Sequence, residues 1–447
     1  MMVRAWLASI IVATAIAGPQ APAFGAKETA TSDNSNEEIY KELDLFEHAL
    51  SIVRSDYVEE PKAKDLIYGA LKGMLSTLDP YSQFLDPDSY NELKVDTEGE
   101  FGGLGIEITI KDDLLTIISP IDDTPAYNAG LRAGDRIVKI DGELTRGITL
   151  LEAVKKLRGK PKTKVTLTIF REGETELKET ELERAIITIE SVREANILED
   201  HIAYIRLSDF REKTADDLSA AIKRLKEQAM DSLILDLRNN PGGLLDVAVS
   251  VAELFLNRNQ LIVTTRGRLR NQNQELRARA AGSVNGVPLV VLINEGSASA
   301  SEIVAGAIQD HHRGVIMGTK SHGKASVQTI FPLKDGSALR LTTSKYFTPS
   351  GRSIHGQGIP PDVEVPFQRP PEEKSKEEKD KEKSSEVFDR IESGKGMDKD
   401  GKATSQTIEE RKRQDTQLAR AIDLLKGIKV YQPEGKTHIE GKARAFN

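Results

Sequence analysis

The chain has 447 residues, a formal net charge of −8 and no cysteine. It is too long for one compact core, so we expect two or three domains. The negative charge and the lack of a long basic run argue against nucleic acid as the main partner. The lack of cysteine excludes a thiol nucleophile, disulfides and cysteine-ligated metals, although it fits any cellular compartment.

The first 26 residues have the pattern of an export signal. Arg4 supplies an early positive charge, and an apolar run from Ala5 to Ala17 is followed by small residues. This order is typical of a signal peptide, and the run is short for a transmembrane helix. We expect residues 1–26 to direct export to a bacterial periplasm or cell envelope. If the segment is not cleaved, it would keep the protein at the membrane.

Residues 36–97 are predicted to form an N-terminal helical region. Apolar residues recur at spacings of three and four from Ile39 to Tyr57, and a second helical run covers Lys62 to Leu78. Two helices of this kind cannot bury such a stripe by themselves. Either the main domain covers it, or a second copy of the chain does and the protein is a homodimer.

Residues 98–186 have the pattern of a separate module of short strands, tight turns and one helix. The glycine cluster "GEFGGLGIEI" opens it. We expect strands at "LLTIISPI", "DRIVKIDG" and "KVTLTIFREG", and a helix at "TLLEAVKKLR". A segment of about 85 residues is long enough for a self-contained domain.

From residue 187 to residue 367, strands and helices alternate. We expect strands at 201–207, 232–238, 288–293 and 314–318, and helices at 214–230, at 244–256 and over "SEIVAGAIQD". The apolar strand "SLILDLR" suits a sheet that is buried on both faces. Thr214 and Asp217 resemble a capping box at the first of these helices. The alternation predicts an α/β layer fold.

Two segments complete the chain. Residues 368–405 are highly charged with few apolar side chains, which predicts a disordered linker. An amphipathic helix, "DTQLARAIDLLKGI", is expected within the tail 406–447.

The stretch "GSASASE", residues 296–302, offers three serines as nucleophiles. A serine hydroxyl attacks well only when a neighbouring base takes its proton. Three histidines lie nearby in the sequence, and an aspartate could orient one of them, so a serine–histidine–aspartate triad is one alternative. The residues concerned are His311, His312 and His322, with Asp236 or Asp310.

Lys324 is the other candidate base. A lysine accepts a proton only when it is neutral, which requires its pKa to fall from about 10.4 toward 7–8. Burial of the ammonium produces such a shift. No acidic residue lies between Gly318 and Leu333 to oppose it. The alternative interpretation is a surface lysine in a loop.

The stretch "LDLRNNPGG", residues 235–243, predicts the remaining part of a hydrolytic site. A buried strand ends here, Gly242 and Gly243 form a turn, and a helix follows. Free backbone amides at a helix N-terminus stabilise developing negative charge, which is what an oxyanion hole requires.

Five motifs in the same order resemble the carboxyl-terminal processing proteases, which are serine peptidases with a serine–lysine dyad and an inserted PDZ domain. The motifs are "FGGLGIEI", "LDLRNNPGG", "GSASASE", "SHGKASVQ" and "YFTPSGRSIHGQGIPPDVEV". The resemblance covers residues 37–367 and, more weakly, 406–430. It implies a catalytic core over 187–367 of the ClpP or crotonase type, an α/β mixed sheet with helices. It also implies a β-rich PDZ domain over 98–186 and N-terminal helices.

The resemblance assigns roles to the site residues. It makes Ser299 the nucleophile and Lys324 the general base, with Gln328, one helical turn further on, orienting the lysine. No cofactor or metal is implied. The family often has Gly-Lys-Gly where this chain has Gly-Lys-Ala, so Ala325 puts the geometry of the loop and the resting activity in question.

The oxyanion hole implied by the resemblance combines two backbone amides. One belongs to Ala300, directly after the nucleophile. The other belongs to a glycine of the "NNPGG" turn, and we prefer Gly242 to Gly243.

A PDZ domain adds an extended chain end to a sheet edge and holds its terminal carboxylate on backbone amides. Here the expected carboxylate-binding residues are Leu104, Gly105 and Ile106. Substrates would be proteins or peptides with exposed apolar C-terminal tails. Arg158, at the end of the helix of the module, is a candidate sensor of tail binding, with a solvated turn residue as the alternative. An adaptor protein is a further candidate partner, and a catalytically silent PDZ scaffold is the non-enzymatic alternative.

Overall fold

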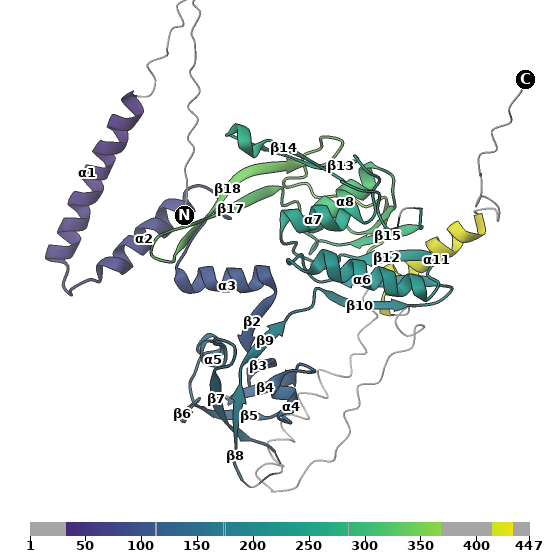
Figure 1. The fold of residues 1–447 in the computed structure, drawn as a ribbon. Coiled ribbons are helices and arrows are strands. Elements are labelled where there is room, and N and C mark those ends of the chain that lie inside the picture. The colour runs from purple at the N-terminus through teal and green to yellow at the C-terminus, as the bar shows by residue number, and fades with distance from the viewer. Residues whose placement is uncertain are drawn as a thin grey trace, which may run out of the picture. The chain divides into compact units, whose positions relative to one another are not determined.

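The computed structural model describes residues 33–111, 114–172, 174, 176–284, 286–367 and 414–431 (Figure 1). The expected signal peptide and charged linker lie outside these residues. The chain divides between Ala70 and Leu71 into two units. No helix in the described ranges is long and apolar enough to cross a bilayer.

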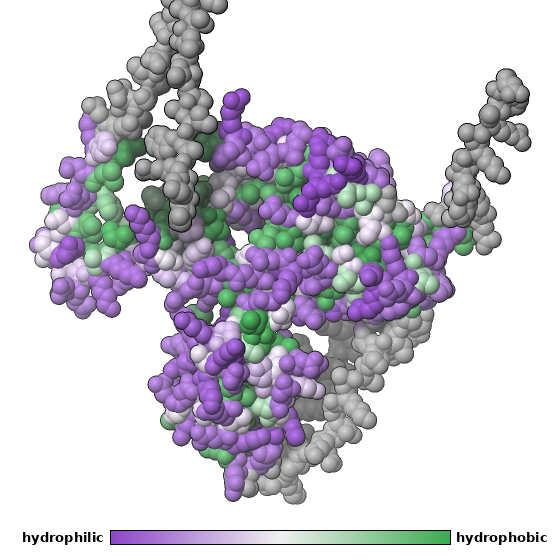
Figure 2. Space-filling view, viewed as in Figure 1, coloured by the Kyte–Doolittle hydropathy of each residue, from purple (hydrophilic) through white to green (hydrophobic). Residues whose placement is uncertain are grey.

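The first unit consists of helix α1 (Asp33–Asp56) and the first half of α2 (Ala63–Ser76). Apolar side chains follow α1 as a stripe, and Figure 2 shows them on its surface. Leu43 is 54% exposed and Phe46 is 43% exposed. An exposed apolar stripe of this kind is a candidate contact surface.

The α/β core of the second unit is a six-stranded sheet in the order β10-β11-β12-β15-β16-β19. Neighbouring strands from β11 to β19 pair in parallel, and β10 pairs antiparallel with β11. β12 and β15 are buried at every position, which agrees with the continuous apolar patterns in their sequences. The six strands are β10 (Val192–Ile197), β11 (Ile202–Leu207), β12 (Ser232–Asp236), β15 (Leu289–Ile293), β16 (Val315–Gly318) and β19 (Val363–Glu364).

Helices cover this sheet on both faces. Side chains alternate along a strand, so Ile205 and Leu235 lie in one hydrophobic cluster whereas Tyr204 and Ile234 lie in another. The first cluster includes residues of α6 (Thr214–Glu227), α7 (Leu245–Glu253) and α8 (Ala300–Asp310). The second includes residues of α11 (Thr416–Tyr431), the last described element of the chain (Figure 1).

α11 is an integral layer of the core. Its side chains Leu418, Ile422 and Leu425 are each at most 1% exposed. Burying three aliphatic side chains of this size contributes roughly 5–9 kcal/mol before conformational entropy is subtracted. The amphipathic helix expected over 415–428 is therefore confirmed, and its burial ties the C-terminal segment to the sheet.

A second sheet, which the sequence did not predict, packs beside the first. Its strands follow the order β1-β18-β13-β14, with β17 on β18. Their patterns are mixed polar and apolar because many of their side chains are only partly buried. The strands are β1 (Gln83–Leu85), β13 (Leu261–Gly267), β14 (Gln274–Arg277), β17 (Ser326–Pro332) and β18 (Ala338–Phe347), with the short helix η1 (Arg270–Gln272) before β14.

The inserted module has its own sheet and its own core. The chain enters it after α3 (Pro87–Glu98) through β2 (Glu100–Gly103) and leaves through β9 (Ala185–Thr188). These two strands pair antiparallel, so entry and exit lie side by side. Inside the module are β3 (Ile106–Lys111), β4 (Leu114–Pro120), α4 (Pro125–Asn128), β5 (Arg136–Ile140), β6 (Glu143–Leu144), α5 (Leu150–Leu157), β7 (Lys164–Phe170) and β8 (Lys178–Glu183).

The capping box expected at the start of α6 is wrong. α6 begins without a side-chain cap. The hydroxyl of Thr214 instead accepts from the backbone N–H of Arg211, at 2.9 Å. Thr214 therefore stabilises the turn before the helix.

Candidate active site

Ser299 lies on a strained turn between a buried strand and a helix. β15 ends at Ile293 and α8 begins at Ala300. Between them, Ser299 has φ 55° and ψ −114°, which is unusual for a residue with a side chain. Such strain persists only where the surroundings enforce it, and it concentrates at functional sites. Of the three candidate serines, Ser297 and Ser301 have buried hydroxyls that donate to backbone carbonyls.

The predicted catalytic residues line one cavity of about 550 Å³. Ser299, Lys324 and Gln328 all contribute to its wall, together with Gly242 and Gly243. The fold therefore brings together the residue before α8, the segment that leads into β17, β17 itself and the turn after β12. Apolar side chains form much of the remaining wall, including Leu93, Phe210, Leu244, Leu245, Ile303, Val327 and Ile330.

The surroundings of Lys324 favour its neutral form. Burial lowers the pKa of Lys324, and the nearby charge of Arg340 lowers it further. Two groups act in the opposite direction. The charge of Glu302 raises the pKa, and the ring of Tyr81, whose centroid lies 4.9 Å from Nζ, favours the ammonium. The net direction is downward, as a general base requires.

Glu302 connects the backbones of the two predicted catalytic residues. Its carboxylate accepts from the N–H of Ser299 at 2.8 Å and from the N–H of Lys324 at 3.0 Å. It also accepts from the hydroxyl of Ser321 and from the N–H of Gly323. Glu302 is fully buried, and burial raises its pKa although these four donors favour the carboxylate. Glu302 was not among the predicted site residues, although its position three residues after Ser299 resembles a capping box.

Tyr346 makes the complementary contacts from β18. Its single O–H is shared between the carbonyl oxygens of Ser299, at 3.1 Å, and of Lys324. Burial raises the pKa of Tyr346 well above its ordinary value, so the hydroxyl remains a donor. Glu302 thus holds the two N–H groups and Tyr346 holds the two carbonyls. Tyr346 is the first residue of the motif "YFTPSGRSIHGQGIPPDVEV", but its contact with the site was not predicted, because the contact depends on the second sheet.

The turn after β12 presents free amides next to Ser299. A Cβ at Gly242 would lie 2.8 Å from Cβ of Ser299 and 2.8 Å from N of Ala300, so only glycine fits there. The N–H of Gly242 already donates to the side chain of Asn240, at 2.9 Å. In the described part of the chain, nothing accepts from the N–H of Gly243 or of Ala300. The amides of Gly243 and Ala300 are therefore without an acceptor among the described residues, whereas the amide of Gly242 is engaged.

Gln328 lies on strand β17, so the expectation that it follows Lys324 by one helical turn is wrong. Its amide nitrogen donates to the hydroxyl of Ser326 at 2.8 Å. The four-residue spacing suggested a helix, but the residues continue into the second sheet.

The histidines of the alternative triad lie elsewhere. No histidine of the described residues lines the cavity that contains Ser299. Nε2 of His311 bonds to the carbonyl of Leu261, and His322 is exposed. The candidate aspartates are also engaged, because Asp236 pairs with Arg238 and Asp310 pairs with Arg352.

The predicted tail-binding residues lie between β2 and β4. Gly105 has φ 75°, and a Cβ there would come within 2.4 Å of Thr124, so the position requires glycine. The carbonyls of Leu104 and Gly105 accept hydrogen bonds. No described residue accepts from the amides of these two residues. The guanidinium of Arg158 lies 4.3 Å from the ring centroid of Phe101 in β2, and the residue is half-buried.

Comparison with known proteins identifies a peptidase domain, a PDZ domain and an N-terminal domain. Residues 201–365 match the family model of peptidase family S41, and residues 116–171 match that of the PDZ domain. Residues 11–89 match the N-terminal domain of the activating protease CtpB.

Relatives match over most of the chain. A carboxy-terminal-processing protease of Bartonella bacilliformis is 45% identical over 398 residues, which cover 88% of this chain and 90% of that protein. A carboxyl-terminal-processing protease of Synechocystis is 40% identical over 327 residues, which cover 71% of this chain and 75% of that protein. The solved photosystem II D1 C-terminal processing protease is 31% identical, with a TM-score of 0.43, and the match covers 71% of this chain and 86% of that one. The chain belongs to the carboxyl-terminal processing proteases, the serine peptidases of family S41 that carry a PDZ domain.

Proposed function

We propose that this protease cleaves proteins near exposed apolar C-termini with a dyad of Ser299 and Lys324. The single observation that carries the proposal is that the strained serine and the lysine of lowered pKa line the same cavity. The apolar wall of this cavity suits an apolar side chain of the substrate.

The proposed reaction proceeds through an acyl-enzyme. Neutral Lys324 takes the proton of Ser299 as Oγ attacks the scissile carbonyl. The amides of Gly243 and Ala300 stabilise the oxyanion. The ammonium of Lys324 then returns the proton to the leaving amine, so the peptide bond breaks. A water molecule then gives a proton to Lys324 as its oxygen attacks the acyl carbonyl, and the ammonium returns that proton to Oγ of Ser299 as the ester bond breaks.

Gln328 orients Lys324 in this proposal. Its amide nitrogen is held by Ser326, which leaves the carbonyl oxygen of the side chain to accept from the ammonium. Acceptance stabilises the charged lysine while it carries the proton.

The PDZ domain recognises the substrate tail in this proposal and controls access to Ser299. Support comes from the amides of Leu104 and Gly105, which have no acceptor in the described chain. Ile106 begins the strand to which a peptide would add. Arg158 would sense tail binding, because its guanidinium stacks on Phe101 in the ribbon that leads into the module.

We further propose that the protein is exported to the cell envelope and forms a homodimer through α1. The exposed stripe of α1 supports pairing, and the order of charge and apolar residues before Gly18 supports export. The proposal also includes an adaptor protein as a binding partner of the protease.

Cleavage of a quenched fluorescent peptide with an apolar C-terminal tail tests the proposal. Ser299→Ala and Lys324→Ala should both abolish cleavage, and His322→Ala should retain most of it. Lys324→Arg should also be inactive, because an arginine does not release its proton. Loss of cleavage in His322→Ala with survival in Lys324→Ala would support a histidine-dependent hydrolase instead. No cleavage by the wild-type protein of any tailed substrate would support a silent PDZ scaffold.

A further inference from the structure

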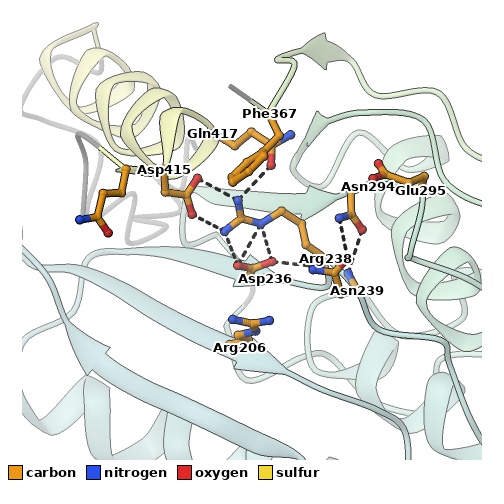
Figure 3. A pocket seen from close by; sticks show the side chains of 10 residues that line it. Arg206, Asp236, Arg238, Asn239, Asn294, Glu295, Phe367, Asp415 and Gln417 are labelled. Carbon is orange, nitrogen blue, oxygen red and sulfur yellow. Dashed lines mark hydrogen bonds and ion pairs between the residues drawn. The ribbon is translucent and has the colours of Figure 1, made fainter. Parts of the chain in front are cut away.

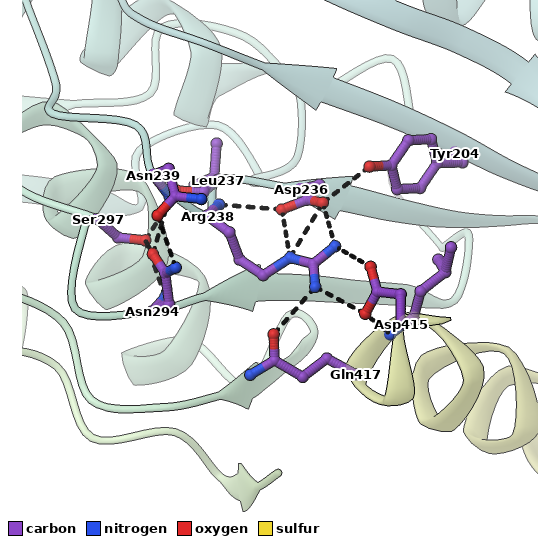
Figure 4. A network of polar contacts seen from close by, with 10 residues as sticks. Tyr204, Asp236, Leu237, Arg238, Asn239, Asn294, Ser297, Asp415 and Gln417 are labelled. Carbon is purple, nitrogen blue, oxygen red and sulfur yellow. Dashed lines mark hydrogen bonds and ion pairs between the residues drawn. The ribbon is translucent and has the colours of Figure 1, made fainter. Parts of the chain in front are cut away.

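A buried ion-pair network joins the C-terminal helix to the turn that bears the oxyanion amides (Figure 3). Arg238 is the last residue before this turn, Asn239–Gly243. Its side chain is 10% exposed, and its guanidinium faces two carboxylates at once. One is Asp236 at the end of β12, and the other is Asp415 at the start of α11 (Figure 4).

Every N–H group of the Arg238 guanidinium has an acceptor. Nη1 and Nη2 donate to the two carboxylate oxygens of Asp415, at 2.9 and 2.7 Å. Nε and Nη2 donate to Asp236, and Nη1 also donates to Gln417 at 2.9 Å. Such bidentate pairs fix the orientation of both partners. Burial would raise the pKa of Asp415, but the hydrogen bonds and the charge of Arg238 hold it below its ordinary value.

The network continues from Arg238 to the nucleophile. Asn239, whose φ is 56°, exchanges two hydrogen bonds with Asn294, at 2.8 and 2.9 Å (Figure 4). The next carbonyl, of Asn240, accepts from the N–H of Ala298 and from the hydroxyl of Ser301, both at 3.0 Å. Two sets of hydrogen bonds therefore link the turn with the oxyanion amides to the segment that carries Ser299. Asn239 makes one set and the carbonyl of Asn240 makes the other.

We infer that Arg238, held by Asp415 of the C-terminal helix, is a positioning residue for the oxyanion turn. α11 then completes the active site from outside the catalytic segment, although it does not line the cavity of Ser299. Without Asp415, the guanidinium keeps Asp236 and Gln417 but loses the charged, bidentate partner that fixes its orientation on the α11 side. This inference rests on the proposed roles of Ser299, Gly243 and Ala300.

Asp415→Asn is the sharpest test, because asparagine retains the second function of this residue. Asp415 also caps α11 by accepting from the N–H of Leu418, and asparagine caps a helix about equally well. The substitution therefore removes the ion pair and keeps the start of the helix. Asp423→Asn is the matched control, because Asp423 lies on the same helix, 63% exposed, with Arg420 at 3.7 Å.

Steady-state kinetics with the fluorescent peptide are measured well below the melting temperature of each variant. Asp415→Asn should lower kcat by about tenfold to a hundredfold, because misplacement of reacting groups by about 1 Å has effects of this size. KM should change little, since the network does not contact the substrate cavity. Asp415→Glu should recover part of kcat, and Asp423→Asn should match the wild type.

If Asp415→Asn does not fold, Gln417→Met provides a milder test. It removes one neutral acceptor of Arg238, together with the donor to the carbonyl of Val365, and keeps a side chain of similar length. It should lower kcat by a smaller factor at unchanged KM. Wild-type kcat in a folded Asp415→Asn or Gln417→Met protein overturns the inference, and so does a change in KM alone. Ser299→Ala is assayed in parallel. If it retains activity, the proposed dyad fails, whereas an inactive Ser299→Ala with a fully active Asp415→Asn refutes only the role of Arg238.

Discussion

Glu302 holds the backbone N–H groups of both Ser299 and Lys324. Its carboxylate accepts four hydrogen bonds, from Ser299, Ser321, Gly323 and Lys324. Every partner is a donor, so the ionised form is the one that satisfies them all. A buried carboxylate without such donors would be costly.

Glu302→Gln should therefore reduce both stability and activity. The amide nitrogen of glutamine would face at least one N–H or O–H donor, and a buried donor left unsatisfied costs about 1–3 kcal/mol. Thermal unfolding should show a lower melting temperature, and kcat should fall because the loops of Ser299 and Lys324 lose their common acceptor. Glu227→Gln, at the exposed end of α6, is the control and should change neither quantity. Unchanged kcat and stability in Glu302→Gln would show that the contacts are dispensable.

Lys324 should destabilise the folded protein at neutral pH. Its pKa is lowered on folding, so the unfolded chain binds the proton more tightly between the folded pKa and the ordinary value of 10.5. The free energy of unfolding is not reduced by this group above the pKa of Lys324 in the unfolded chain. It decreases as the pH falls below that value, and the loss is complete below the pKa of Lys324 in the folded protein. Lys324→Met should therefore melt at a higher temperature than the wild type at neutral pH, and the difference should shrink as the pH approaches 10.5.

The control for this prediction is Lys334→Met at an exposed position. It should shift the melting temperature little at any pH. A lower melting temperature for Lys324→Met at neutral pH would mean that the ammonium is stabilised by its surroundings, and the lysine would then be a poor base.

Among the elements, α1 should mediate pairing of two chains. Its exposed stripe includes Phe46, and Leu50 lies one turn further on. Phe46→Glu and Leu50→Glu should convert a dimer into a folded monomer, measured by light scattering with gel filtration. Lys41→Glu changes charge outside the stripe and should leave the dimer intact. If the stripe variants unfold instead, the helix belongs to the core of its own chain.

The elements of the α/β core could be predicted from sequence, whereas those of the second sheet could not. Buried strands such as β12 and β15 are apolar at every position, which leaves a clear pattern. β17 and β18 are mostly half-buried, and their residues are polar and apolar in mixed order. This is why Gln328 was expected on a helix and why Tyr346 was not expected at the site.

Ser299 and Lys324, which line one cavity, could be selected as candidates from sequence because each lies in a short segment with its own local pattern. The residues that hold them come from distant segments, and local pattern does not show such contacts. Arg238 illustrates the limit. Its own segment was recognised, but its partner Asp415 lies 177 residues away and beyond a charged linker.

At the scale of the whole molecule, the PDZ domain should select substrates and control access. Its two connecting strands, β2 and β9, pair side by side with Gly103 opposite Ala185. Residues 104–184 can therefore be replaced by an Asn-Gly turn, which closes a hairpin of two paired strands. The catalytic domain should fold, and cleavage should lose its preference for apolar tails. The measurement compares kcat/KM for peptides with apolar and with acidic C-termini.

The matched control for the deletion is Gly105→Ala in the full chain. A Cβ at this position would meet Thr124, so the tail-binding loop should be distorted while the domain is kept. It should lose tail preference in the same direction as the deletion. If both proteins retain the rates and the preference of the wild type, the module neither selects nor gates.

The central claim is that Lys324 takes the proton of Ser299, and the pH dependence of kcat/KM tests it most directly. We expect kcat/KM to rise with pH, with a midpoint below the value of about 10.4 for an ordinary lysine, because burial and Arg340 favour the neutral amine. Arg340→Gln should move this midpoint upward, since it removes a charge that lowers the pKa of Lys324, and His322→Ala should leave it in place. The opposite result is a midpoint at about 6.5, the value typical of histidine. If this midpoint disappears in His322→Ala and does not move in Arg340→Gln, the account is contradicted.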